Sequence, residues 1–400
     1  MSSDACAVVL GGATAGCSII HELHAHGVGP IVLLDKRART GSLSRRIAEF
    51  QLVAPESGAL RDALLGIHAR YGRCVLFPTF DEHLEQLVEV HDELAHACHL
   101  PFNPENLTAS LSKITQYEAC ERLGVAYPRT TYLHGVQDLE GLSEIPFPFL
   151  LKPQEKTREV IQPRLVESAA DLTTHRPIVE KHLSQGISYL ASEFVPGDGS
   201  NIHAYVGLRT ADGRILNEWI GKKLSQYPHE FGVFASASNQ CPEEVRVLGR
   251  KLIDGMDLHG IVEPEFKYDS RDGSFKLMEI NLRSMGWVHV GHLSGVPLHY
   301  CQFLHATGQD VPHFEQDQAR DIRLIQLQSE VSNLLHREHY GPIFRSVLGH
   351  GDRRVIAMCD PRDPRPAFSV LTGTAVIVAK WLRDRLRGSR SGGPARPEAA

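Results

Sequence analysis

Continuous apolar runs, a glycine turn and a segment of helical period divide the start of the chain into a strand, a tight turn, a helix and a second strand. These segments are Ala7–Leu10, Gly11–Gly16, Ser18–His26 and Ile31–Leu34, with Asp35 closing the second strand. A further apolar run, Cys74–Phe77, precedes a helix predicted from Glu82 to about His96. This order predicts a β-α-β unit of the doubly wound kind.

The pattern changes after a proline-rich boundary at Pro101–Pro104. A helix is predicted at Ser112–Leu123, a strand at Phe149–Lys152 and another at Tyr189–Val195. Two hairpins should follow, pairing Ile202–Gly207 with Ile215–Gly221 and Ile261–Tyr268 with Phe275–Asn281, with a helix at Glu243–Met256 between them. Strands and helices that mix in this way predict an α+β domain after the α/β one.

Composition narrows the class of protein. A chain of 400 residues suggests two or three domains, and 42% hydrophobic residues can form a sizeable core. The net charge of −6 argues against a nucleic-acid partner. Eight widely spaced cysteines without a C-x-x-C pair predict free thiols in a cytoplasmic protein, and no apolar run is long enough to cross a membrane. Membrane association is therefore not expected, and a homodimer is left open.

Carboxylates gather on the second predicted hairpin. Glu279 and Asn281 are alternate positions of one strand and therefore share a face, and Glu265 lies on the partner strand. Two carboxylates and an amide oxygen are ligands that Mg²⁺ accepts together with phosphate oxygens. Arg283, two residues further on, has the guanidinium fork that pairs with a phosphate or carboxylate.

Two lysines and a strand end complete the set. Lys152 closes an apolar strand, where burial makes its charge costly unless an anion pairs with it, and Lys113 begins the helix after the proline boundary. The strand before Pro196-Gly197 leaves backbone groups that could meet an adenine edge, with Glu193 and Asp198 nearby.

These residues appear in an order and spacing that resemble the ATP-grasp superfamily. The resemblance covers roughly residues 5–310. The runs Gly221-Lys-Lys-Leu-Ser-Gln-Tyr-Pro, Val262–Arg283, Gly286-Trp287 and Val75–Glu82 resemble its carboxylate–amine ligase branch. The resemblance implies a Rossmann-like pre-ATP-grasp domain at 1–108 and an ATP-grasp domain at 109–312, divided into 109–190 and 191–312. A C-terminal region at 313–387 and a disordered tail at 388–400 would follow.

The resemblance also implies roles for single residues. ATP phosphates would meet Lys113, Lys152 and either Lys222 or Lys223, and adenine would meet Glu193, Phe194 and Val195. Asp198 would hold the ribose. Glu265, Glu279 and Asn281 would hold Mg²⁺, or Mn²⁺ in its place, and Arg283 would steady the transferred phosphoryl group together with Lys152 and Lys223. The implied activity joins a small-molecule carboxylate to an amine through an acyl phosphate.

Two features depart from this pattern. Such enzymes carry a glycine-rich lid over the phosphates, but 153–165 contains no glycine, so Lys156 and Arg158 are the residues left to cover them. Met285 stands beside Gly286-Trp287, where an aromatic residue is expected.

Other functions stay open on the sequence. Gly11–Gly16 has the outer spacing of a P-loop, but Cys17 replaces the required lysine. The same turn, with Asp35 after it, would suit an NAD(P)-dependent oxidoreductase, although a tight turn without nucleotide is the preferred interpretation. A nucleotide-binding module without catalysis is the third hypothesis. His21, His24 and His26 on one helix, and His289 and His292 later, have no acid or cysteine at metal-ligand spacing.

Overall fold

The computed structural model describes residues 5–110, 112–154, 161, 163–228 and 232–388. The chain divides into two compact units. The larger one, called here the large unit, contains 1–111, 198–265 and 280–400, and the small unit contains 112–197 and 266–279. Each unit is described by itself.

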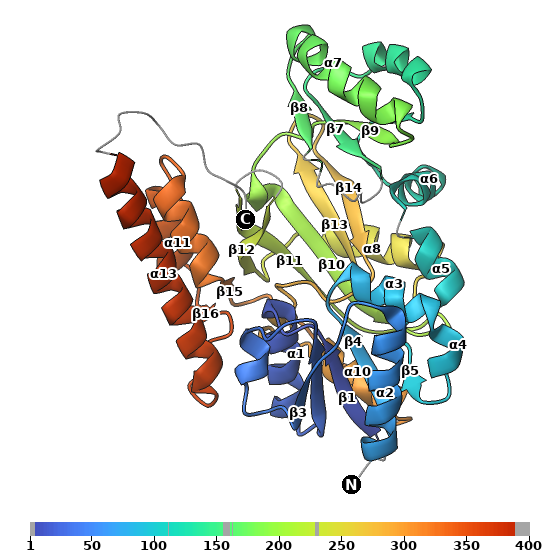
Figure 1. Ribbon diagram of the computed structural model, residues 1–400, viewed down its shortest axis with the longest axis vertical. Helices are drawn as coiled ribbons and strands as arrows, with labels where there is room; N and C mark the ends of the chain where they lie inside the picture. The colour runs from blue at the N-terminus through green and yellow to red at the C-terminus, as the bar shows by residue number, and fades with distance from the viewer. Residues whose placement is uncertain (1–4, 111, 155–160, 162, 229–231, 389–400) are drawn as a thin grey trace. The chain divides into compact units, whose positions relative to one another are not determined.

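A five-stranded parallel sheet organises the N-terminal part of the large unit (Figure 1). Its order is β3-β2-β1-β4-β5, formed by Glu49–Leu52, Ile31–Asp35, Ala5–Leu10, Arg73–Pro78 and Cys98–His99. Val8 of β1 pairs with Val32 on one side and with Leu76 on the other. Every β1 residue is buried, which explains its unbroken apolar run, because a parallel sheet is covered on both faces. The predicted β-α-β unit is confirmed.

Helices follow the strands in the expected order. They are α1 (Thr14–Ala25), α2 (Ser57–Tyr71), α3 (Asp81–Glu89), α4 (His91–Leu94) and α5 (Pro104–Ser110). The single helix predicted from Glu82 to about His96 is two helices, because the backbone leaves the helical region at Val90. The helix predicted at Ser18 begins four residues earlier, inside the glycine turn.

A second, seven-stranded sheet has the order β14-β13-β10-β11-β12-β15-β16. The strands are β10 (Ile202–Arg209), β11 (Ile215–Tyr227), β12 (Val233–Ser238), β13 (Gly260–Asp269), β14 (Ser274–Asn281), β15 (Ile322–Ile325) and β16 (Arg353–Ile356). The predicted hairpin between β10 and β11 is confirmed as antiparallel, and it turns at Gly213, whose φ of 84° suits glycine. The helix between the hairpins is α8 (Glu243–Gly255), close to its predicted bounds.

The small unit has its own sheet and core. Four strands lie in the order β6-β9-β7-β8, formed by Thr130–Leu133, Tyr189–Glu193, Phe149–Pro153 and Arg164–Val166. Helices α6 (Lys113–Leu123) and α7 (Ala169–Ser184) accompany them. Strand β9 ends at Glu193, two residues before the predicted Val195, ahead of the Pro196-Gly197 break.

The C-terminal part of the large unit is helical. It contains α9 (His289–Leu293), α10 (Leu298–Ala306), α11 (Leu327–His336), α12 (Gly341–Gly349) and α13 (Pro364–Gly388). Helix α13 lies along α11 (Figure 1), and the indole N–H of Trp381 donates to the Leu335 carbonyl at 2.9 Å. The predicted terminal helix at Val376–Leu386 is therefore the end of a longer helix that packs on its own unit. The tail predicted to be disordered lies, from residue 389, outside the described residues.

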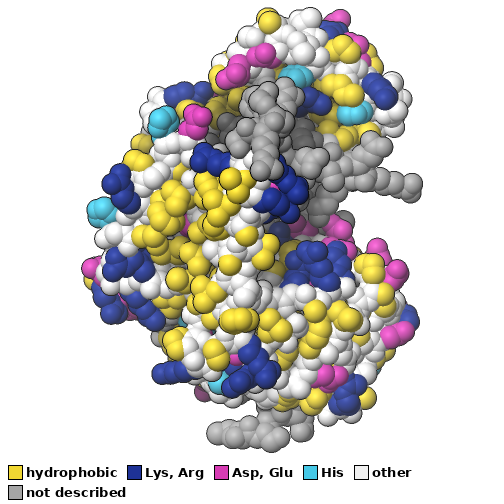
Figure 2. Space-filling model, turned by 60° about the vertical axis from the view of Figure 1, so that its left-hand side comes forward, with side chains coloured by type: hydrophobic (Ala, Val, Ile, Leu, Met, Phe, Trp, Pro, Cys, Tyr) yellow, Lys and Arg dark blue, Asp and Glu magenta, His cyan; other side chains and the backbone are white. Residues whose placement is uncertain are grey.

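Hydrophobic side chains remain on the outer side of α13, where Figure 2 shows them gathered in a stripe. They include Phe368, Leu371, Val376, Leu382 and Leu386. Among the described helices, none combines the length and the hydropathy that a membrane span needs.

Candidate functional site

The two predicted phosphate-binding lysines and one predicted metal ligand come together in the small unit. Lys113 is the first residue of α6, and its Nζ donates to the Met278 carbonyl at 2.5 Å. The same Nζ lies 3.7 Å from Oε2 of Glu279 on β14. The charges of both Lys113 and Glu279 act on Lys152 of β7. Lys113 and Glu279 are 166 positions apart in the sequence, and the fold brings them together.

Lys152 is a partly buried cation for which no ion pair with another described residue is found. Burial, with repulsion from Lys113 added, lowers the pKa of Lys152 to about 8, and attraction to Glu279 offsets only part of this. No described carboxylate forms an ion pair with Lys152. An anion such as a phosphate group would supply the missing charge, so the small unit is prepared to receive one.

Glu193, the predicted adenine contact, is occupied by other side chains. Its carboxylate accepts from the Arg271 guanidinium at 2.5 Å, and Lys276 lies 3.5 Å away. Arg271 and Lys276 also share the buried Asp269, whose carboxylate lies 2.6 and 2.7 Å from them. This charge network fixes the end of β9, so any adenine contact of Glu193 would compete with two cations.

Phe194 and Val195, which follow Glu193, are held in place by different contacts. The Phe194 backbone N–H donates to the Pro148 carbonyl at 3.1 Å, and Lys267 Nζ lies 5.2 Å from the centre of the Phe194 ring, within cation–π range. Val195 is buried. Backbone groups at this strand end therefore lie on a rigid segment.

In the large unit, Lys223 and Glu265 form a buried ion pair. Lys223 Nζ lies 2.7 Å from Glu265 Oε2, and both side chains are less than a tenth exposed. Lys222 precedes it on β11 and points to the other face of the strand, because neighbouring strand residues alternate. It pairs with His203 and Ser238 across the sheet. Lys223, rather than Lys222, is thus the lysine that shares a site with a predicted metal ligand.

A second carboxyl group, Glu263, lies two positions before Glu265 on β13 and was not singled out by the sequence. It is fully buried and accepts a hydrogen bond from the Trp287 indole N–H at 3.0 Å. Burial, and then the negative charge of Glu265, raise the pKa of Glu263 well above its usual value. Its Oε2 has no hydrogen-bond partner among the described residues. Burial therefore favours the protonated form of Glu263, two positions before Glu265 on the same strand.

Arg283 is held by a carboxylate from the N-terminal sheet. Its Nε and Nη2 donate to Asp81 at 2.6 and 3.1 Å, a two-pronged contact that fixes the guanidinium plane. Asp81 begins α3 and belongs to the run Val75–Glu82 that carried part of the predicted resemblance. Asn281, two residues before Arg283, is also buried.

The residue after Arg283 is anchored by a buried chain of polar groups that sequence reasoning missed. The Ser284 hydroxyl and His299 Nε2 lie 2.8 Å apart, and His299 Nδ1 lies 2.9 Å from Glu22. Backbone N–H groups of His299 and Tyr300 also donate to Glu22. The Glu22 carboxylate is held ionised with a pKa of about 2 because its contacts with His299 and backbone N–H groups outweigh its burial. Helix α1 thereby supports the segment that carries Arg283.

The glycines of the turn at Gly11–Gly16 are required by the backbone conformation and close packing there. Gly11 has φ +94°, and a side chain at Gly16 would place its Cβ 1.9 Å from the Gly11 carbonyl oxygen. The Asp35 carboxylate accepts from the Gly12 N–H at 2.7 Å and pairs with Arg39 at 3.1 Å. Asp35 therefore closes the turn itself, which supports the preferred interpretation of a turn without nucleotide.

The remaining predicted residues lie as follows. Asp198 caps a short 3-10 turn by accepting from the Ser200 N–H at 2.9 Å and from its hydroxyl at 2.7 Å. Glu265 and Asn281 belong to the large unit and Glu279 to the small unit. Lys156 and Arg158 fall outside the described residues. The eight cysteines are free, as predicted, and no group of described His, Cys, Asp and Glu residues has metal-site geometry.

Comparison with known proteins gives relatives of one kind. No family model matches the chain. A D-aspartate ligase of Enterococcus faecium (strain Aus0004) is 26% identical over 219 residues, which are 51% of each chain. The chain thus spans about half the length of the curated relative it matches.

Solved structures are similar over most of the chain. The N5-carboxyaminoimidazole synthetase from Staphylococcus aureus has a TM-score of 0.65 at 15% identity, covering 86% of this chain and 88% of that one. An L-amino acid ligase from Bacillus licheniformis has 0.61 at 15% identity, with 81% and 80% covered. The biotin carboxylase from Campylobacter jejuni has 0.61 at 14% identity, with 78% and 72% covered. The predicted fold class is confirmed: the chain has a Rossmann-like N-terminal domain followed by an ATP-grasp fold.

Proposed function

We propose that the protein is an ATP-dependent ligase that joins a small-molecule carboxylate to an amine and releases ADP and phosphate. One observation carries the proposal. Lys152 is a partly buried cation beside Lys113 and Glu279, and no carboxylate of the described residues forms an ion pair with it. A triphosphate supplies the negative charge that such a pair of lysines needs.

ATP would be held mainly by its phosphates. In the proposal, Lys113 and Lys152 meet them from the small unit, and Lys222 or Lys223 from the large one. The strand end Glu193, Phe194 and Val195 would meet adenine, with backbone groups as the more suitable partners because the Glu193 carboxylate is already paired. Asp198, which caps its own turn, is the proposed ribose contact.

Mg²⁺ suits the proposed donor set, with Mn²⁺ as a possible substitute. Glu265, Glu279 and Asn281 would hold it, and the oxygens of two carboxylates and one amide are hard donors. Lys223 lies 2.7 Å from Glu265 and gives this buried carboxylate a counter-charge. A bound divalent cation would neutralise charge on the phosphates.

The chemistry follows in two balanced steps. An oxygen of the substrate carboxylate attacks the γ-phosphorus, the bond to the β-phosphate oxygen breaks, and an acyl phosphate and ADP form. The amine nitrogen then attacks the acyl carbon, phosphate leaves and an amide remains after loss of a proton. The protein contributes position and charge rather than covalent chemistry. Arg283, whose guanidinium group is oriented by Asp81, would face the transferred phosphoryl group.

The relatives suggest the class of substrate. The similar proteins include a D-aspartate ligase and an L-amino acid ligase. We therefore favour an amino acid as one of the two substrates, in the cytoplasm, where ATP is available. The domain boundaries 1–108, 109–312 and 313–387 are part of the same proposal. An NAD(P)-dependent oxidoreductase is not supported by any of these relatives.

ADP release tests the proposal. Purified protein with MgATP is given pairs of acids and amines, amino acids first, and ADP is measured. Lys152→Ala and Glu279→Gln should each lower ADP release about 100-fold or more, since the first removes a cation that would meet the phosphates and the second a carboxylate that would hold Mg²⁺. Lys251→Ala, on the exposed side of α8, is the matched control and should keep full turnover. Undiminished turnover in either site variant would overturn the site assignment.

A further inference from the structure

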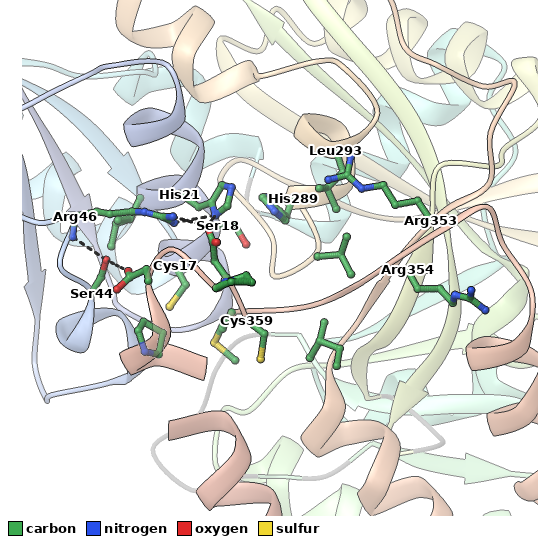
Figure 3. Close-up of a pocket in the computed structure, with 18 residues that line it drawn as sticks. Cys17, Ser18, His21, Ser44, Arg46, His289, Leu293, Arg353, Arg354 and Cys359 are labelled. Carbon is green, nitrogen blue, oxygen red and sulfur yellow. Dashed lines mark hydrogen bonds and ion pairs between the residues drawn. The ribbon is translucent and has the colours of Figure 1, made fainter. Parts of the chain in front are cut away.

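A cavity of about 510 Å³ lies in the large unit and is used by none of the roles above (Figure 3). It is bounded by α1, by the segment after Leu43, by α9, and by β16 with the turn that follows it. Its volume is in the range of small-molecule sites. Side chains from four separate parts of the sequence therefore enclose one chamber.

One side of the chamber carries two carboxylates. Asp360 forms an ion pair with Arg46 and lies 3.1 Å from His21 Nδ1. Asp363, which is buried, accepts from the Ser44 hydroxyl and from the Arg45 backbone N–H. An ionised carboxylate has about four acceptor positions, so both groups keep acceptor capacity beyond these contacts.

The opposite side carries a guanidinium without an ionic partner. Figure 3 shows Arg353 and Arg354 leaving β16 in opposite directions, Arg353 toward His289 and Leu293 and Arg354 away from them. Arg354 donates to the Leu348 carbonyl at 2.8 Å. For Arg353, no ion pair with another described residue is found. Ser44 and Arg46, which mark the carboxylate side, lie across the chamber from it (Figure 3).

A histidine between the two sides has an unsatisfied ring nitrogen. His289 is 7% exposed, and its Nδ1 has no hydrogen-bond partner among the described residues. Its ring centre lies 4.9 Å from that of His21. Burial keeps both imidazoles neutral, with the pKa of His289 well below its usual value and that of His21 at about 4. A buried polar atom without a partner is unfavourable, and a ligand in the chamber that hydrogen-bonds to His289 Nδ1 would relieve this cost.

The charges facing the chamber define the ligand. Arg46, Arg353 and Arg354 line the cavity together with Asp360 and Asp363. Arg354 points away from His289 (Figure 3) and donates to the Leu348 carbonyl, so its charge is directed out of the chamber. The two other guanidinium groups are matched by the two carboxylates, with Arg353 at one end of the chamber and the carboxylates at the other. A phosphate dianion would add two negative charges to this balanced set, and the described residues form no metal-site group. A molecule that is itself neutral, with a carboxylate at one end and an ammonium group at the other, matches both ends.

We propose that this cavity binds an amino acid as a zwitterion, with its carboxylate on Arg353 and His289 and its ammonium group toward Asp360 and Asp363. That the amino acid is a substrate rests on the proposed ligase function, whereas its binding does not. The carboxylate that pairs with Arg353 would be held in place by this ion pair. The group of the substrate that reacts would then be a second functional group of the same molecule.

Calorimetric titration tests the binding. Full-length protein is titrated with alanine, aspartate and glutamate in both enantiomers, with succinate, which lacks the ammonium group, and with inorganic phosphate. Each titration is done without nucleotide and with a non-hydrolysable ATP analogue and Mg²⁺. Arg353→Gln should weaken amino-acid binding about 10- to 100-fold, since it removes a charged hydrogen-bonded contact. Arg345→Gln, at an exposed position of α12 that does not line the cavity, is the control and should bind as the parent does.

A second readout locates the ligand. Cys359 lines the cavity and Cys241 does not, and both thiols are partly buried. Alkylation followed by peptide mass spectrometry should show that the bound amino acid slows modification of Cys359 but leaves Cys241 unchanged. Because burial raises the pKa of Cys359, the reaction is run near pH 9.

The outcomes separate this proposal from the proposed function. Equal affinity in Arg353→Gln and in the control Arg345→Gln, or no protection of Cys359, would overturn the cavity assignment. So would the absence of amino-acid binding with or without nucleotide, or equally tight binding of succinate or phosphate. Suppose that amino-acid binding depends on Arg353 but that none of the acids tested causes the protein to release ADP. This result would support the cavity assignment and refute the ligase function.

Discussion

Replacing Lys152 by methionine should make the protein more stable and less able to bind ATP. Burial lowers the pKa of Lys152 from 10.5 to about 8. One pKa unit corresponds to about 1.4 kcal/mol, so the buried charge costs the folded state about 3 kcal/mol relative to the unfolded chain at pH 7. Methionine has a similar length and no charge, and it removes this cost.

The pH dependence has a definite sign. Below pH 8, lysine is protonated in both states and the full cost applies. Between pH 8 and 10.5 the folded state has lost the proton while the unfolded chain keeps it, so the cost fades to about 1 kcal/mol at pH 9.5. The stability gained by Lys152→Met should shrink accordingly as the pH rises.

Urea denaturation followed by circular dichroism, at pH 7 and 9.5, measures the free energy of unfolding. MgATP should stabilise the parent protein by mass action and the variant much less. Lys251→Met, at an exposed position of α8, is the control and should change stability by no more than about 0.5 kcal/mol. The reasoning would be refuted if Lys152→Met were less stable than the parent at pH 7. It would also be refuted if the difference in the free energy of unfolding between the two proteins were the same at both pH values.

Three further predictions concern acidic residues of the large unit. Glu22→Gln should lower the free energy of unfolding by about 3 kcal/mol at pH 7, and this loss should shrink as the pH falls from 4.5 toward 2, where the Glu22 carboxylate of the parent protonates; urea midpoints at pH 7 and 3 measure it. Glu263→Gln should leave stability at pH 7 within about 1 kcal/mol, because Glu263 is already neutral, whereas a large loss there would show that it is ionised. Asp81→Asn should lower kcat about 10-fold with an unchanged circular dichroism spectrum, since it weakens the contact that orients Arg283; an unchanged kcat would remove Arg283 from the site.

Local patterns predicted the parts of the fold that depend on neighbouring residues. The continuous apolar runs of β1 and β2 predicted strands that are buried on both faces of a parallel sheet. The turn at Gly213 predicted that β10 and β11 form a hairpin. The bounds of α1 and β9 were less accurate, because the glycine turn and the Pro196-Gly197 break determine them rather than apolar spacing.

Contacts between distant segments could not be predicted in the same way. His299 meets Glu22 across 277 positions, and Arg283 meets Asp81 across 202. Neither pair has a local signal, since a buried acid in a helix resembles a surface one until its partner is known. The Arg353 cavity likewise depends on which segments the fold brings to α1. The spacing from Glu265 to Arg283 was informative because it lies on one hairpin.

The most direct test of the central claim follows an oxygen atom. The acid that gives the most ADP release is prepared with ¹⁸O in its carboxylate and incubated with the amine and MgATP, and the released phosphate is analysed by mass spectrometry. An acyl-phosphate ligase must transfer one ¹⁸O atom to phosphate for each amide formed. Phosphate that carries no ¹⁸O while amide accumulates, or ADP release that needs no acid, would contradict the account.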